Sequence, residues 1–182
     1  MGSVAAIRFR PAEYRGDMRW TRLLLLGLVF VSLVEAARPW SSAPSVVPSH
    51  FDAAGRPNAW TPRDVFFALQ VGVTLGIGVL FIGMTRLLKS IPLSLINLPN
   101  KGYWLAPQRR EETLDRLASY FDVFASATVL LLMVVFELTS LASRGGGLAT
   151  NLFLPALVSY LVFSAGWTVA LIRTFASVTP AG

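Results

Sequence analysis

The sequence predicts an all-α integral membrane protein with four transmembrane helices. Of its 182 residues, 54% are hydrophobic and only 14% are charged, which is outside the usual composition of soluble domains. The apolar residues are concentrated in four almost charge-free segments, residues 23–37, 65–85, 123–142 and 152–172. A helix of about 20 apolar residues crosses the hydrocarbon core of a bilayer, so the last three segments are long enough to span it.

The first apolar segment is shorter and contains Glu35, yet it also fits a spanning helix. Trp20 and Trp40 bracket the segment, and 20 helical residues cover about 30 Å, which places one indole at each membrane interface. A cleaved signal peptide is the alternative, because arginines, an apolar run and small residues follow one another in the order typical of such signals. Under either interpretation the following loop lies on the outer face.

Basic residues are distributed unevenly among the segments that connect the four helices. Twelve arginines and lysines lie before the first helix, between the second and third, or after the fourth, whereas the other two loops hold four. By the positive-inside rule, both termini and the central loop are cytoplasmic. The high isoelectric point, about 10.5, therefore reflects topology signals and contacts with the lipid bilayer, and we expect no nucleic-acid partner.

The predicted spans divide the chain into four parts. Residues 1–22 form a cytoplasmic N-terminal segment, and residues 23–88 form a helix–loop–helix unit whose outer loop is 39–63. Residues 89–120 form a cytoplasmic loop that includes an amphipathic helix from residue 107, lying on the membrane surface. Residues 121–175 form the second pair of transmembrane helices, joined by a flexible, glycine-rich outer turn at 143–151.

The short outer loop at 39–63 ends in a clear helix-start signal. We expect Gly55 to adopt a left-handed conformation in a turn, since glycine takes positive φ without penalty. Thr61 is expected to cap the second helix, with Pro62 as its first residue and Asp64 near the positive end of the helix dipole.

Four ionisable residues are candidates for a binding site at the outer face: His50, Asp52, Glu35 and Glu137. The topology places all four on the same side of the membrane, where a cluster could bind a cation, a basic peptide or an amine. The alternative is that each residue is satisfied locally: the two loop residues would order their own loop by hydrogen bonds, and the two glutamates would pair with near neighbours or with water at the headgroups.

The cytoplasmic loop offers a second candidate interface, formed by Lys101, Trp104, Arg109 and Arg110. These residues could dock a soluble partner, or they could anchor the loop to lipid headgroups, which we favour.

The residue inventory argues against enzymatic chemistry. The chain has no cysteine and one histidine, which excludes disulfides, thiolate metal sites and multi-histidine metal centres within one chain. No serine-based catalytic arrangement and no phosphate-binding glycine loop can be identified. We therefore expect no catalytic residues, no metal and no cofactor.

The run from Pro48 through His50, Asp52 and Gly55 to Trp60, set between two membrane helices, resembles the family catalogued as domain of unknown function 1648. The resemblance extends over about residues 23–88, and the run 96–107 followed by paired arginines is also similar to members of the family. Its best-known relatives are immunity proteins that protect a cell from a secreted sporulation-delay toxin and sequester a repressor at the membrane. Those relatives have six spans, whereas this chain has four predicted spans.

The resemblance implies immunity or signalling in a bacterial plasma membrane, and it implies no catalytic residue. The preferred function is non-enzymatic sensing or binding at the outer face, coupled to a membrane or cytoplasmic protein partner. One alternative is a small ion-coupled transporter that uses Glu137 and Glu35. Another is an accessory subunit that scaffolds a larger membrane complex.

Overall fold

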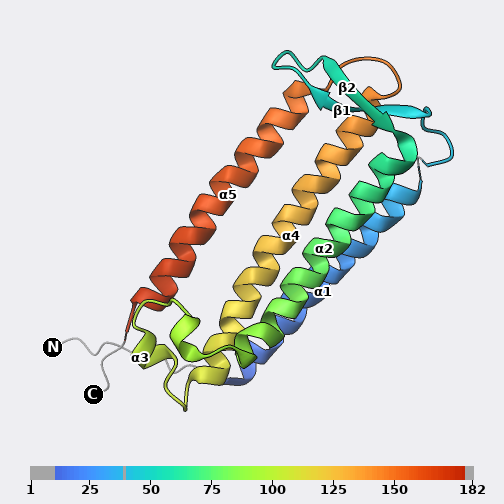
Figure 1. Cartoon of the computed structure of the whole chain (residues 1–182). Helices are drawn as coiled ribbons and strands as arrows, with labels where there is room; N and C mark the ends of the chain where they lie inside the picture. Colours follow the sequence, from blue (N-terminus) through green and yellow to red (C-terminus); the bar gives the residue numbers. More distant parts are fainter. Residues whose placement is uncertain (1–10, 39, 179–182) are drawn as a thin grey trace.

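The computed structural model describes residues 11–38 and 40–178 and consists mainly of four long helices that lie side by side (Figure 1). The four long helices are α1 (Pro11–Ala37), α2 (Arg63–Ser90), α4 (Arg110–Ala142) and α5 (Thr150–Ala176). Each is long and apolar enough to cross a membrane, which confirms the prediction of four membrane-length helices. They alternate in direction along the chain, so the start of α1 and the end of α5 lie at the same end of the bundle (Figure 1).

The two ends of the bundle carry different structures. A β-hairpin and the α4–α5 linker cover one end, here called the hairpin end (Figure 1). The segment between α2 and α4 covers the other, here called the loop end, and includes a short 3-10 turn (Leu93–Leu95) and the one-turn helix α3 (Lys101–Trp104). The helices therefore hold two small, separate surfaces apart at opposite ends.

The hairpin shows that the all-α prediction is wrong at the outer loop. Strand β1 (Val46–Phe51) pairs in antiparallel fashion with β2 (Pro57–Pro62), with Val47 opposite Thr61 and Pro48 opposite Trp60. β-branched and aromatic residues favour such pairing, but prolines 48, 57 and 62 argue against a strand. They are tolerated here because both strands of a two-stranded hairpin are edge strands.

The start of α2 also differs from the prediction. Thr61 and Pro62 belong to β2, so Thr61 pairs with Val47 and does not cap the helix, which begins at Arg63 with no side-chain cap. The strand ladder takes up the residues that would otherwise have formed the helix cap. Asp64 lies in the first turn of α2, as expected.

The amphipathic helix predicted from residue 107 to lead into the third span is the start of α4, which begins at Arg110, but it is buried and does not lie on a surface. Residues 110–120 form the first turns of the continuous 33-residue helix α4, and residues 113–118 are six consecutive buried positions. A helix on a membrane surface buries only one face, so this run of buried residues shows that α4 is covered around its circumference. Leu114 and Leu117 do share a hydrophobic cluster with Phe121, as the spacing predicted, but this cluster is buried between the loop and the ends of the helices.

Among the residues whose burial the structure describes, three hydrophobic clusters hold the bundle together. The cluster at the hairpin end is Ala36, Ala43, Val47, Phe66 and Phe67. The middle cluster is Leu25, Ala125, Val129 and Met133. The cluster at the loop end is Leu88, Ile96, Leu98, Leu105, Leu114, Leu117 and Phe175. Helix α4 contacts α1, α2 and α5. In the membrane-length apolar part of α5, no residue is buried.

Candidate functional site

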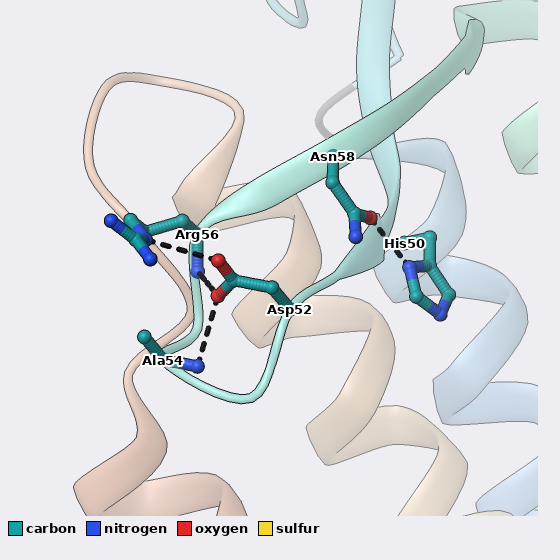
Figure 2. A network of polar contacts seen from close by, with 5 residues as sticks. All are labelled: His50, Asp52, Ala54, Arg56 and Asn58. Atoms are coloured by element: carbon teal, nitrogen blue, oxygen red, sulfur yellow. Dashed lines mark hydrogen bonds and ion pairs between the residues drawn. The ribbon is translucent and has the colours of Figure 1, made fainter.

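The turn of the hairpin is organised by the carboxylate of Asp52 (Figure 2). Its Oδ1 accepts hydrogen bonds from the backbone amides of Ala54 (2.9 Å) and Arg56 (2.8 Å), and its Oδ2 accepts one from Nε of Arg56 (3.0 Å). The backbone amide of Arg56 has the largest effect and lowers the pKa of Asp52 below its ordinary value of 3.8. Desolvation, the next largest effect, opposes it, and the guanidinium of Arg56 and the amide of Ala54 lower the pKa further. Asp52 thus makes the hydrogen bonds that the loop-ordering alternative requires.

His50 is held by the opposite strand. Its Nδ1 is hydrogen-bonded to Oδ1 of Asn58, and both residues are exposed (Figure 2). An amide oxygen only accepts hydrogen bonds, so Nδ1 carries the hydrogen and donates it. The second ring nitrogen, Nε2, points away from Asn58 (Figure 2) and has a free lone pair when the ring is neutral.

The hairpin is anchored by the side chain of Val47, which is 1% exposed. Val47 belongs to a cluster with Phe66 and Phe67 at the start of α2, and Trp40 stacks on Phe67 with ring centroids 5.5 Å apart. The opposite strand stays open, because Trp60 is 59% exposed. The hairpin therefore has one side buried on the helices and other side chains presented outward.

The α4–α5 linker fixes the turn from the other side. Gly55 is buried with φ of +76°, which confirms its predicted left-handed conformation, and its carbonyl accepts a hydrogen bond of 2.8 Å from the amide of Leu148. A Cβ on Gly147 would lie 2.6 Å from the same carbonyl oxygen. The linker, which the sequence predicts to be a flexible turn, is thus in close backbone contact with the hairpin at these positions.

The two glutamates of the candidate cluster lie on separate helices near the hairpin end. Glu35 is half-buried near the end of α1, and Glu137 is exposed on α4. Among the residues whose side chains the structure describes, no three histidine, aspartate or glutamate side chains are grouped as a metal site requires. His50 and Asp52 are instead engaged by Asn58 and Arg56.

At the loop end, the residues of the candidate cytoplasmic interface make internal contacts. The indole Nε1 of Trp104 donates to the carbonyl of Phe175 (2.7 Å) at the end of α5, and the two rings pack edge to face. Nζ of Lys101 donates to the carbonyl of Ser94 (3.0 Å). These bonds satisfy carbonyls at a helix end and in the loop, so both side chains help to fold the loop onto the bundle.

The two arginines of that interface are also engaged. The guanidinium of Arg109 lies over the ring of Tyr103, 4.0 Å from its centroid, and Nη2 of Arg110 lies 3.5 Å from the carbonyl of Lys89. Trp104 thus joins the loop to α5, and Arg110, the first residue of α4, joins that helix to the end of α2. These contacts hold the loop as a compact cap on the ends of the helices.

Sequence reasoning missed two ion pairs on α4. Nε of Arg22 on α1 lies 2.9 Å from Oδ2 of Asp122, which is fully buried. Nζ of Lys89 lies 2.8 Å from Oδ1 of Asp115, in an ion pair whose geometry is not that of a hydrogen bond. A signal did exist for the first pair, because Asp122 directly precedes the apolar segment 123–142, and a buried carboxylate is usually paired with a cation. Arg22 is one of the twelve basic residues that the positive-inside rule counts, and its pairing is an additional role.

The comparison with protein families identifies the segment that includes the hairpin. Residues 27–74 match the model of a family described as domain of unknown function (DUF1648), which confirms the resemblance over that part of the chain. The match begins in α1, includes the whole hairpin and ends at Thr74 in α2, whose hydroxyl lies 3.2 Å from that of Ser32. No curated protein and no solved structure matches the chain.

Proposed function

Because residues 27–74 match the DUF1648 family and have the hairpin at their centre, we propose that this protein is a non-enzymatic membrane protein that binds a ligand or partner through the hairpin at the outer face of the membrane. A toxin-immunity role, which the resemblance implies, would be one form of this function, with the toxin as the ligand. The cytoplasmic loop would then carry the response to a partner inside the cell.

The observation that carries the proposal is a fixed backbone with exposed recognition side chains. The turn is held by Asp52 and by the contact between Gly55 and Leu148, while His50, Asn58 and Trp60 remain exposed. A surface that is ordered before binding loses little conformational entropy when a partner arrives. Tryptophan is among the residues that contribute most of the binding energy at protein interfaces.

The outward orientation rests on the distribution of charge. The basic segments that the positive-inside rule assigns to the cytoplasm are those that connect or flank the helices at the loop end. The hairpin would therefore lie outside the cell and the loop inside.

The test is a photocrosslinking residue introduced at Trp60, compared with one at Val79, which is 72% exposed on the membrane-length part of α2. We expect a specific crosslinked product only from position 60 in cells. His50→Ala should remove that product while the amount of protein in the membrane is unchanged. Loss of the protein itself would instead assign His50 an ordering role, and equal products at both positions would contradict the proposal.

The accessory-subunit alternative is favoured by one separate observation. No residue in the membrane-length apolar part of α5 is buried, so the exposed face of α5 is available to pack against a helix of another membrane protein. Affinity purification in mild detergent tests this role: a defined partner would support it, and a lone homogeneous protein would contradict it.

A further inference from the structure

Helix α5 lies at the edge of the bundle (Figure 1). Helices α1, α2 and α4 pack on one another, whereas α5 packs mainly against α4, and no residue in its membrane-length apolar part is buried. The hydroxyl of Tyr160 is hydrogen-bonded to that of Thr128 on α4 (2.9 Å), and the indole of Trp167 donates to the carbonyl of Tyr120 on α4 (2.9 Å). Because so little of α5 is buried, its position depends strongly on the contacts at its two ends.

At the hairpin end, the first residue of α5 lies against the hairpin turn. A Cβ on Gly55 would lie 2.9 Å from a methyl of Thr150, and the carbonyl of Gly55 already accepts a hydrogen bond of 2.8 Å from the amide of Leu148. The linker glycines with positive φ, residues 145–146, precede this contact. The most freely rotating part of the linker therefore lies between the hairpin contact and α4, and not between that contact and α5.

At the loop end, two side chains bind the last turn of α5. The last four carbonyls of a helix have no partner within it, and here the first two of them accept hydrogen bonds from the hydroxyl of Ser177. The carbonyl of Phe175 accepts one from the indole of Trp104 (2.7 Å), and that of Ala176 accepts one from the amide of Asn100 (2.7 Å). Trp104 and Asn100 together are here called the latch.

We propose that α5 couples the hairpin to the loop, so that a displacement of the hairpin turn shifts α5 along α4 and opens the latch. Helix shifts in switching proteins are about 1–2 Å, and a hydrogen bond of 2.7 Å does not survive a shift of that size along its axis. Opening would free the side chains of Trp104 and Asn100 in the loop. The use of this coupling in signalling rests on the proposed function, because it needs a ligand that displaces the turn, whereas the coupling itself is a property of the folded chain.

The first test places a wedge at the hairpin end and measures the latch at the loop end. Gly147→Ala introduces a Cβ 2.6 Å from the carbonyl oxygen of Gly55. In proton–nitrogen NMR spectra of the full chain in detergent micelles, hydrogen exchange at the indole of Trp104 should become about tenfold faster, as expected for an overpacked contact. Gly166→Ala is the matched control within α5, because a Cβ there meets nothing within 4 Å, and should leave the rate unchanged. Exchange at the parent rate in Gly147→Ala would overturn the proposal.

The second test works in the reverse direction, because coupling between two sites is reciprocal. Trp104→Phe removes the donor to α5 but keeps an aromatic ring, and the amide of Leu148 at the hairpin end should exchange about fivefold faster, which corresponds to the loss of one hydrogen bond. Lys101→Met is the matched control, because it removes a hydrogen bond to Ser94 within the loop, and should leave the Leu148 rate unchanged. An unchanged rate in Trp104→Phe would overturn the proposal, also in the case that the wedge variant does not fold.

Neither test uses a ligand, so the coupling and the proposed function can fail separately. Absence of a crosslinked product at Trp60 would contradict binding at the hairpin and leave the coupling standing. Exchange at the parent rate in the two variants would contradict the coupling and leave binding at the hairpin standing.

Discussion

The backbone carbonyl of Gly55 accepts a hydrogen bond of 2.8 Å from the amide of Leu148, which joins the hairpin turn to the α4–α5 linker. The two residues lie in different halves of the chain, and only the first lies within the DUF1648 match at residues 27–74. A displacement of the hairpin by a ligand would therefore act on α4 and α5 as well as on the helices that flank the hairpin directly.

Gly55→Ala should destabilise the hairpin end. The φ of +76° is strained for alanine, and the new Cβ would lie 2.9 Å from a methyl of Thr150 and 3.0 Å from the carbonyl oxygen of Leu148. Backbone strain of this kind costs about 1–3 kcal/mol, so the purified chain should unfold at a lower temperature and its linker should be cleaved faster by protease. Gly76→Ala is the control, because a Cβ there meets nothing within 4 Å. Equal stability of the two variants would contradict the close approach.

The Arg22–Asp122 pair should behave as a coupled unit. Asp122→Leu alone leaves the cation without this carboxylate partner, and loss of one partner of a buried pair costs about 3–5 kcal/mol. The double variant Arg22→Met with Asp122→Leu should recover most of the stability, because two apolar side chains need no partner. Thermal denaturation of the purified chain measures all four members of the cycle. If the two single effects simply add, the pair contributes no coupling energy.

Stability of the turn should depend on pH through Asp52. Because the folded-state pKa of Asp52 is below its ordinary value of 3.8, its carboxylate stabilises the turn above pH 3.8, and this stabilisation is lost as the pH falls through the lower value. The amide chemical shifts of Ala54 and Arg56 should therefore move at acidic pH in step with one another. Asp52→Asn should abolish that shared transition, and a transition that persists in the variant would assign it to another group.

Helix α1 should be retained in the mature protein. Leu25 is fully buried in a cluster with Ala125 and Val129 of α4, and Arg22 pairs with Asp122, so removal of α1 would expose both an apolar surface and a buried carboxylate. The intact mass of the protein isolated from membranes should therefore include α1. A mass that corresponds to a chain beginning at residue 37 would show that the segment before it is a cleaved signal peptide.

The sequence predicts well those features that depend on local chemistry. The four apolar segments predict the helices because an apolar run of membrane length is typical of a spanning helix. Gly55 has the predicted conformation because turn geometry is set within about four residues. Asp52 makes the local hydrogen bonds that were the alternative to its role in binding. The hairpin was not predicted because its prolines argue against strands. They are tolerated because β1 and β2 pair only with each other, so both are edge strands.

The features that sequence analysis missed depend on packing between distant segments. Trp104 has the sequence character of an interfacial anchor, and only the proximity of the end of α5 makes it a donor to Phe175. The surface helix expected from residue 107 is buried because the loop folds back over α4, which its spacing of apolar residues alone does not reveal. Likewise, the register of the hairpin brings Asn58 to His50, and the packing of α1 on α4 brings Arg22 to Asp122.

The most direct test of the account is the position of the hairpin relative to the membrane. The chain has no cysteine, so Ala53→Cys in the exposed turn and Gln108→Cys in the loop each introduce a single reactive thiol, and the parent chain is the unlabelled control. With a membrane-impermeant maleimide, we predict that Ala53→Cys is labelled in intact cells and that Gln108→Cys is labelled only after permeabilisation. Labelling of Gln108→Cys but not Ala53→Cys in intact cells would place the hairpin inside and contradict its role in recognition at the outer face.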